Sequence, residues 1–281
     1  MKQYLDALRY VLETGIDRQS RTGIKTRAMF GMQLRFNMED GFPAVTTKKL
    51  AWNSVVSELL WFIEGSNDER RLAEILHGTR DSSKKTIWTA NAEADYWKPK
   101  AKFEGDLGRI YGVQWRRWKA PHGKEIDQLA EAIRLIKTNP TSRRIIVTSW
   151  NPGELDQMAL PPCHAFFQFF VANDKLSLLM YQRSCDMFLG VPFNIASYSL
   201  LLYMVAQVTG LKPAEFVHTL ADTHIYHNHF EQVKEQLARK PFTLPNLWLN
   251  PEIKNIDDFT MNDIKLENYN FHPPIKAEMA V

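Results

Sequence analysis

Residues 161–194 constrain this chain more than any other stretch, because they place chemically active side chains among strand-like runs. Both cysteines of the chain, Cys163 and Cys185, lie there. Alternating apolar residues over 165–171 and 176–182 predict two strands joined by a four-residue hairpin loop. We therefore expect an active site built on a sheet, with Cys163 as its nucleophile.

Two features support Cys163 as a nucleophile. Two prolines precede it and restrict the backbone, which helps to position a reacting atom. A thiol attacks as the thiolate, and a neighbouring cation favours that form. Arg183 is the best candidate, because a strand that follows a hairpin can lie beside the strand that begins at Cys163. The alternative is a buried structural cysteine.

The composition is typical of a folded protein with a mild positive charge. The 281 residues suit one large domain, residues 1–281, and 44% of them are hydrophobic. The net charge of +3 suits an anionic small molecule and is far from that of a dedicated nucleic-acid binder. Two cysteines exclude a disulfide framework and favour a reducing compartment.

We expect a soluble, cytoplasmic protein that does not cross a membrane. The N-terminus shows no signal peptide, because an acidic residue, Asp6, interrupts it before an apolar core forms. The longest apolar run, around residues 200–206, is far shorter than the roughly 20 residues that span a bilayer.

The spacing of apolar residues predicts an α+β fold rather than a regular βαβ repeat. The predicted helices cover residues 2–14, 52–65, 123–137, 200–208 with a start at Pro192, and 223–239. The predicted strands cover residues 26–36, 144–149 and the two strands of the hairpin. Residues 66–108 are polar and irregular, and we expect residues 66–118 to form a smaller, variable lobe of the same domain.

Glu58 is a candidate for proton chemistry. It lies in the predicted helix 52–65 with apolar neighbours, Val55 at i−3 and Phe62 at i+4. No lysine or arginine lies near it in the sequence, so burial would raise its pKa. The alternative is an ordinary exposed glutamate on the helix.

Arginines accompanied by small hydroxyl residues suggest a phosphate site. They are Arg21, Ser142, Arg143, Arg144, Arg183 and Ser184. Such residues bind phosphate well, and no glycine-rich P-loop suggests a nucleoside triphosphate instead. Arg143 and Arg144 would point to opposite faces if both lay in a strand. The alternative is a set of scattered surface arginines.

Asp186 and Asn194 could read a heterocyclic base. A carboxylate accepts hydrogen bonds, whereas an amide both donates and accepts. An amide therefore matches the uracil edge, where N3–H donates and O4 accepts. A helix N-cap is the alternative role for Asn194.

Two further clusters have competing interpretations. His224, Tyr226, His227 and His229 suit hydrogen bonding to a polar ligand, and their spacing fits no standard zinc pattern. Residues 113–119 interleave aromatic and basic side chains, as a surface for single-stranded nucleic acid does. A basic face over a buried tryptophan is the favoured interpretation of that run.

A series of motifs occurs in order along nearly the whole chain. They are Arg21-Thr22-Gly23, Gly41-Phe42-Pro43, Thr46-Thr47-Lys48, Glu58-Leu59-Leu60-Trp61-Phe62, Ile110-Tyr111-Gly112, Ser142-Arg143-Arg144, Leu160-Pro161-Pro162-Cys163-His164, Gln182-Arg183-Ser184-Cys185-Asp186, Pro192-Phe193-Asn194-Ile195-Ala196-Ser197-Tyr198, Asp222-Thr223-His224-Ile225-Tyr226 and Ala280-Val281. Together they resemble thymidylate synthase. The resemblance implies an α+β fold with a large mixed β-sheet packed with helices, one sheet face forming a homodimer interface.

The resemblance also implies an activity. It is the reductive methylation of dUMP to dTMP, in which 5,10-methylenetetrahydrofolate gives the carbon and the hydride and becomes dihydrofolate. Cys163 would add to C6 of the pyrimidine and make C5 nucleophilic. No metal, membrane or dedicated nucleic-acid partner is expected.

The resemblance assigns further residues to roles. Catalysis would involve Cys163, Glu58, Tyr111, His164, Arg183, Asn194 and Asp186. dUMP would contact Arg21, Arg143, Arg144, Arg183, Ser184, Cys185, Asp186, Asn194, His224 and Tyr226. The folate would contact Ala51, Trp88, Asn91, Asp186, Gly190, Phe193 and Ala280. Arg143 and Arg144 would come from the other subunit of an obligate homodimer, and the C-terminal residues would close over both substrates.

The chain departs from the usual family pattern at several folate-side positions. Ala51 stands where histidine is common, Thr89 follows Trp88 where an aspartate is usual, and Arg109 replaces a usual proline. The nearest rival activity is a dUMP hydroxymethylase on the same fold, in which water intercepts the exocyclic methylene. A cysteine hydrolase and a non-catalytic nucleic-acid-binding module are the rivals from other classes.

Overall fold

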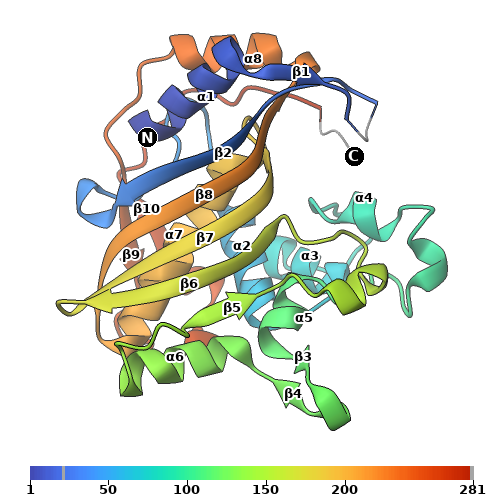
Figure 1. Cartoon of the computed structure of the whole chain (residues 1–281), viewed down its shortest axis with the longest axis vertical. Coiled ribbons are helices and arrows are strands. Elements are labelled where there is room, and N and C mark those ends of the chain that lie inside the picture. The colour runs from blue at the N-terminus through green and yellow to red at the C-terminus, as the bar shows by residue number, and fades with distance from the viewer. Residues whose placement is uncertain (21–22, 279–281) are drawn as a thin grey trace.

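The computed structural model describes residues 1–20 and 23–278, and it confirms the predicted α+β fold (Figure 1). A six-stranded sheet has the order β1-β2-β8-β7-β6-β5. Its strands are β1 Ile16–Arg18, β2 Thr26–Asn37, β5 Ile146–Thr148, β6 His164–Ala172, β7 Lys175–Asp186 and β8 Lys212–Tyr226. β7 and β8 are parallel and the other pairs are antiparallel, so the sheet is mixed.

Helices and short ribbons surround this sheet. The α-helices are α1 Lys2–Thr14, α2 Trp52–Ile63, α3 Glu69–His77, α4 Thr89–Ala92, α5 Tyr111–Arg116, α6 Gln128–Thr138, α7 Gly190–Thr209 and α8 Phe230–Ala238. The 3-10 helices are η1 Met38–Asp40, η2 Lys98–Lys100, η3 Pro121–Gly123, η4 Pro152–Gln157, η5 His227–His229, η6 Ile256–Asp258 and η7 Met261–Asp263. Two ribbons pair β3 Trp118–Lys119 with β4 Glu125–Ile126, and β9 Asn246–Leu249 with β10 Ile264–Glu267.

The core lies between the sheet and helices α7 and α2, which pass behind it in Figure 1. α7 is apolar around its whole circumference, as expected of a helix enclosed by protein. It begins at Gly190, two residues before the predicted start, and ends at Gly210, whose φ of 75° suits a left-handed C-cap. Its length and composition would suit a membrane span, but 83% of its most apolar window is buried in the fold.

The opposite face of the sheet is partly apolar and open. In Figure 1 no helix covers the face of the sheet turned towards the viewer. Side chains alternate across β6, so buried Phe167 and Phe169 leave Phe166 and Phe170 on the other side. Phe170 is 65% exposed, and Phe166 stacks on Tyr181 of β7 at 5.4 Å between ring centroids. An exposed aromatic ring therefore lies on a sheet face that no described helix covers (Figure 1).

The β6–β7 hairpin is tighter than predicted. The strands extend to Ala172 and from Lys175, so only Asn173 and Asp174 form the turn. Both have positive φ, 51° and 56°. Asn and Asp tolerate this conformation, which matches the twist of paired strands in two-residue hairpins.

The predicted helix over residues 223–239 is wrong in its first part. β8 continues to Tyr226, and the helix α8 begins only at Phe230. β8 pairs with β2 on one side and with β7 on the other, and these long-range hydrogen bonds override the local pattern. His224 and Tyr226 therefore lie two residues apart on one strand.

Three other segments also differ from the predictions. Within the stretch described as irregular, α3 is a regular helix that begins after Asp68, whose side chain accepts the Arg70 N–H. α6 begins at Gln128 rather than near residue 123, because the Asp127 side chain caps it. Residues 143 and 144 lie in a turn before β5 rather than in the strand itself.

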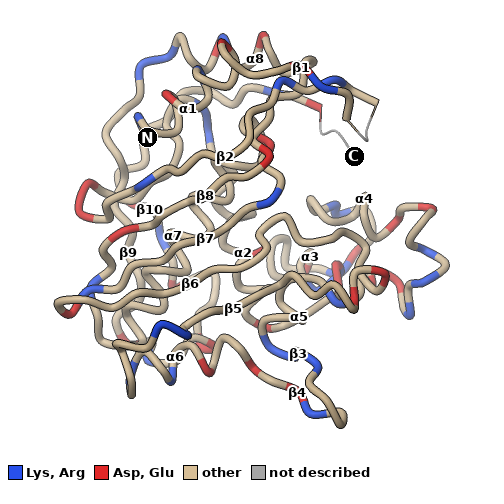
Figure 2. Tube along the Cα trace, viewed as in Figure 1, with Lys and Arg blue, Asp and Glu red and all other residues tan. Residues whose placement is uncertain are grey.

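Charges are distributed along the whole molecule. Figure 2 shows basic and acidic positions interspersed over the trace rather than gathered into one basic face. Trp115, within the aromatic and basic run, is fully buried, while Arg116 pairs with Asp127 and Asp257. The run therefore forms ion pairs and core contacts in the described part of the chain.

Candidate active site

Cys163 lies directly before β6, with Arg183 on the neighbouring strand β7. Arg183 Nη2 lies 3.9 Å from Cys163 Sγ. Two carbonyl groups hold the guanidinium, because Nε donates to Pro162 O at 2.8 Å and Nη2 donates to Pro161 O at 2.6 Å. The prediction that Arg183 lies beside Cys163 is confirmed. The arrangement places a fixed positive charge where it favours the thiolate.

Tyr111 connects the nucleophile to the core of the molecule. Its hydroxyl oxygen accepts the Cys163 backbone N–H at 2.7 Å. Its ring stacks on Phe62 of α2 at 4.9 Å between centroids. Burial raises the pKa of Tyr111, and the nearby Cys163 adds to that increase. The phenol therefore stays neutral next to Cys163.

Glu58 lies on α2 in an aromatic enclosure. Trp88 Nε1 donates to Glu58 Oε1 at 2.7 Å, and the Trp88 ring meets the rings of Tyr111 and Phe62 at right-angled contacts. Burial raises the pKa of Glu58 to about 7, and the hydrogen bond from Trp88 opposes that increase. Of the two interpretations of Glu58, a buried or an exposed helical glutamate, the structure shows the buried one. A carboxyl group with this pKa can hold or release a proton near neutral pH.

His164 and Asn194 lie in a buried polar network. The His164 ring contacts Tyr111 and Tyr198, with centroids 5.3 Å and 5.2 Å away. Burial lowers the pKa of His164 to about 4, against the influence of the Asn194 side chain, so the imidazole is neutral at physiological pH. Asn194 is the fifth residue of α7, so its alternative role as an N-cap is wrong.

Gln182 orients Asn194, and sequence reasoning missed it. Its Nε2 donates to Asn194 Oδ1 at 3.0 Å and to Ser184 O at 2.9 Å, while its Oε1 lies 2.8 Å from His218 Nε2. Burial lowers the pKa of His218 to about 3, so a neutral imidazole donates to Gln182. Gln182 falls on the inward side of β7 with Met180, and that polar residue in an apolar row was a detectable signal.

The ends of β7 and β8 bring other predicted residues together. Asp186 pairs with His224 in the parallel register. Asp186 Oδ1 accepts the N–H groups of Phe188 and Leu189 at 3.0 Å and 3.2 Å. Burial raises the pKa of the Cys185 thiol, so this cysteine stays protonated and inert.

A family model described as Thymidylate synthase matches residues 2–281. The chain belongs to the thymidylate synthase family. Membership indicates a folate-dependent methyltransferase with a role in methylating dUMP during dTMP biosynthesis. Members of the family use methylenetetrahydrofolate. Within the described residues, no group of three or more His, Cys, Asp or Glu side chains could hold a metal ion.

Some residues of the thymidylate synthase motifs do not lie around Cys163 in the structure. Arg143 and Arg144 are exposed, and neither guanidinium has a hydrogen-bond or ion-pair partner among the described residues. Arg143 O accepts from Gln168, which lies midway along β6 and several residues from Cys163. Arg21 and Ala280 lie outside the described residues.

The described residues predicted to contact the folate come from the starts of α2, α4 and α7 and from the end of β7. Asp186, Gly190, Phe193 and Asn91 are half-buried, Ala51 is exposed, and Trp88 is buried. A Cβ at Gly190 would lie 3.6 Å from Asn194 Oδ1 and 3.7 Å from Asp186 Cβ, so Gly190 lies against both of these residues.

Lys48 is a second residue that the sequence did not single out. It is buried, its Nζ donates to Phe188 O at 2.5 Å, and it lies 3.5 Å from the centre of the Phe188 ring. Burial lowers its pKa to about 7, although Asp186 opposes the decrease. A hollow of about 830 Å³ lies elsewhere, lined by residues such as Glu64 and Arg116, and contains none of the predicted catalytic residues.

Proposed function

We propose that the chain converts dUMP to dTMP by reductive methylation, with 5,10-methylenetetrahydrofolate as donor of both the carbon and the hydride. The observation that carries this proposal is the contact series from Arg183 through Cys163 and Tyr111 to Trp88 and Glu58. It joins a thiol beside a cation to a carboxyl group whose pKa is about 7. The proposed reaction needs a thiol that adds to the pyrimidine and a group that exchanges a proton near neutral pH.

The thiolate of Cys163 forms a bond to C6 of the pyrimidine, and the electron pair of the C5–C6 double bond makes C5 nucleophilic. Asn194, oriented by Gln182, hydrogen-bonds to the base edge and supports the charge that develops on O4. When bound, methylenetetrahydrofolate supplies the one-carbon unit and the hydride. C5 would bond to the one-carbon unit and then lose its proton as the bond from that unit to the folate nitrogen breaks. The hydride would complete the methyl group, and rupture of the Sγ–C6 bond would return the Cys163 thiolate and release dTMP and dihydrofolate.

Proton movement in this proposal depends on buried groups. Glu58 gains and loses a proton near neutral pH. His164 stays neutral, and Tyr111 keeps its phenolic proton next to Cys163. Their aromatic neighbours exclude bulk water, which strengthens each hydrogen bond inside the enclosure.

We further propose a homodimer in which Arg143 and Arg144 bind the phosphate of dUMP in the partner's site. Both arginines are exposed and lack a partner among the described residues, and the open sheet face carries Phe170 and the Phe166–Tyr181 stack. A two-fold dimer through that face would bury these apolar groups. It would also place Arg143 and Arg144 of each subunit at the dUMP site of the other subunit.

A spectrophotometric assay with dUMP and methylenetetrahydrofolate tests the reaction. We expect dihydrofolate absorbance to rise in step with dTMP. The rival hydroxymethylase would produce hydroxymethyl-dUMP without dihydrofolate. Detection of that product would contradict reductive methylation. Cytosine nucleotides should be poor substrates, because Asn194 matches the uracil edge.

Mixed dimers test the shared site. Cys163→Ser and the double variant Arg143→Gln/Arg144→Gln should each be nearly inactive alone. If arginines cross the interface, random reassociation of equal amounts forms heterodimers with one intact site each and restores about a quarter of wild-type activity. No recovery after subunit exchange would contradict the crossing of Arg143 and Arg144.

We also propose a reducing, cytoplasmic location. Within the described residues, neither Cys163 nor Cys185 forms a disulfide bond. The proposed reaction requires Cys163 to stay reduced, which a cytoplasmic redox poise supports. Fractionation of the native protein tests this location.

A further inference from the structure

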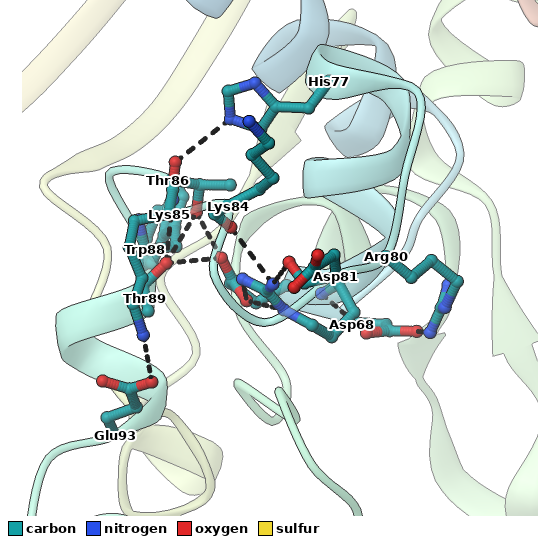
Figure 3. Close-up of polar contacts among 12 residues, drawn as sticks. Asp68, His77, Arg80, Asp81, Lys84, Lys85, Thr86, Trp88, Thr89 and Glu93 are labelled. Carbon is teal, nitrogen blue, oxygen red and sulfur yellow. Dashed lines mark hydrogen bonds and ion pairs between the residues drawn. The ribbon is translucent and has the colours of Figure 1, made fainter.

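A buried carboxylate, Glu69, lies at the start of α3 and outside the residues assigned to the reaction. It is only 1% exposed. Figure 3 shows the polar contacts of the neighbouring loop and turn, with Asp81, Lys84, Thr86, Trp88 and Thr89 labelled. Its Oε2 accepts Arg70 Nε at 2.6 Å, and Arg70 Nη2 completes the ion pair. Its Oε1 accepts the hydroxyl groups of Thr86 and Thr89, each at 2.6 Å. Four donors therefore satisfy one buried charge.

The two threonines form the turn that carries Trp88. The Trp88 N–H donates to Thr86 Oγ1 at 3.1 Å, and the Thr86 N–H donates to Thr89 Oγ1 at 2.8 Å. Each hydroxyl thus accepts from this turn and donates to Glu69 (Figure 3). Because charge-assisted hydrogen bonds are stronger than neutral ones, Glu69 holds the turn more firmly than the threonines alone would.

Arg70 also links the loop before the Trp88 turn to the same carboxylate. Its Nη1 donates to the carbonyl groups of Asp81 and Lys84 at 2.8 Å and 3.1 Å. Arg70 is buried, so opening this ion pair would leave an unpaired charge inside the lobe. The loop therefore has one favoured position relative to α3, and the Trp88 turn follows it.

We propose that Glu69 is a positioning residue for the reaction, because through Thr86 and Thr89 it holds Trp88 where the indole N–H meets Glu58. The inference rests on the proposed function, in which Glu58 handles a proton. The carboxylate that the Thr89 hydroxyl meets reaches the turn from α3. The hydrogen bonds that connect Glu69 to Glu58 run through Thr86, Thr89 and the Trp88 side chain.

The surroundings of Glu58 make its protonation sensitive to the hydrogen bond from Trp88. α2 packs against α3, α5 and α7. The titratable groups that these helices bring towards the Glu58 enclosure are Tyr111 and Tyr198, and burial raises the pKa of both phenols so that they stay neutral. Among the described residues no cation pairs with Glu58, so the Trp88 N–H is its hydrogen-bond donor.

The test follows the Trp88 indole N–H by nitrogen–proton NMR as a function of pH, in the unliganded protein. Trp88→Phe assigns the signal by its loss. In the wild type the signal should titrate together with Glu58. In Glu69→Gln an NH2 donor replaces one carboxylate oxygen. That donor faces either Arg70 or the threonine hydroxyls, which are donors themselves, so the network opens and the hydrogen bond from Trp88 to Glu58 weakens. The titration midpoint should then rise by roughly one pH unit, the size expected for a hydrogen bond to a charged group.

Three further variants sharpen the test. Thr89→Val keeps the shape of the side chain and removes one hydroxyl, so the midpoint should rise by less. Glu69→Gln combined with Thr89→Asp returns a carboxylate to the turn and should bring the midpoint back towards the wild-type value. Arg80→Gln breaks an ion pair to Asp68 in the same lobe and should leave the midpoint unchanged.

Unchanged midpoints in Glu69→Gln and Thr89→Val would overturn the inference, and so would an equal shift in Arg80→Gln. If Glu69→Gln fails to fold, Thr89→Val decides the question. The titration needs no substrate, so a protein without dUMP turnover contradicts the proposed function alone. Normal turnover with an unmoved midpoint contradicts the role of Glu69 alone.

Discussion

The two ends of the candidate site are built in opposite ways. At one end, Cys163 is half-buried at the start of a strand, and its neighbour Arg183 is held by backbone carbonyls. At the other end, Glu58 is buried within a helix, and aromatic rings surround it. Tyr111 touches both ends, because its hydroxyl meets Cys163 and its ring stacks on Phe62.

The two ends differ in whether the fold stabilises a negative charge or disfavours it. A nucleophile, the role proposed for Cys163, must be reachable and must carry charge, and Cys163 is half-buried beside a cation. A proton carrier, the role proposed for Glu58, must be able to lose its charge, and burial without a paired cation among the described residues raises the pKa of Glu58 to about 7. Distinct substitutions should therefore damage the two ends in distinct ways.

The largest effect should come from removing the nucleophile. Cys163→Ser should lower turnover by about 10⁴-fold or more, because an alcohol is a far weaker nucleophile at neutral pH. The variant should still fold, dimerise and bind dUMP within a few-fold of the wild type. Turnover by single-turnover kinetics and dUMP binding by calorimetry measure the two quantities. Turnover within tenfold of the wild type would remove Cys163 as the attacking atom.

A smaller loss is expected at the proton-carrying end. Glu58→Gln keeps an acceptor for Trp88 but removes the titrating proton, so kcat should fall by about 10²- to 10³-fold. dUMP binding should change little, because Glu58 lies in the enclosure rather than beside the phosphate arginines. Steady-state kinetics and dUMP titration separate these effects. Unchanged turnover would exclude Glu58 from the mechanism.

The same variant should change stability in a pH-dependent way. Below about pH 4 both folded and unfolded chains keep the Glu58 proton, so burial has no electrostatic penalty there. Between the ordinary pKa of 4.5 and the folded value of about 7, only the unfolded chain loses the proton, so stability falls as pH rises. Above about pH 7 the loss levels off near 3 kcal/mol.

Urea unfolding of wild type and Glu58→Gln, at equal protein concentration, measures this difference. The glutamine variant should gain about 3 kcal/mol relative to the wild type between about pH 4 and about pH 8. The contributions of His164 and His218 cancel, since both proteins contain them. A pH-independent difference would show that the folded-state pKa of Glu58 is close to its ordinary value.

The smallest effect should appear in the reactivity of the thiol. Arg183→Gln removes the cation 3.9 Å from Cys163 Sγ, so the thiolate fraction near neutral pH should fall. Alkylation of Cys163 by iodoacetamide should slow by about tenfold, and mass spectrometry of the peptide that contains Cys163 measures this rate. An unchanged rate, with the fold intact, would show that another group activates the thiol.

Local sequence patterns predicted the reactive end well. A hairpin necessarily lays two successive strands side by side, so the neighbourhood of Cys163 and Arg183 follows from the order of residues. The burial of Glu58 was also readable, because apolar residues occupy the positions next to it along the helix. The predicted helix over residues 223–239 failed, because β8 gains its stability from β2 and β7, which lie far away in the sequence.

The residues that sequence reasoning missed share one property. Gln182, His218 and Glu69 each act through partners that are distant in the chain, such as the threonines that meet Glu69 from beyond α3. Neither periodicity nor residue type reveals such a partner before the chain folds. Local spacing also predicted a strand that begins at Arg144, whereas the structure places Arg143 and Arg144 in a turn.

The sequence by itself determined which reactive groups this protein has and which of them are neighbours through a hairpin, because strand alternation and tight turns are local properties. Only the tertiary structure decided the proton affinity of Glu58 and the contact that Trp88 makes with it. Those depend on desolvation and on donors brought together from α2, α3 and the turn before α4. Packing of distant segments sets both quantities, and no local pattern encodes them.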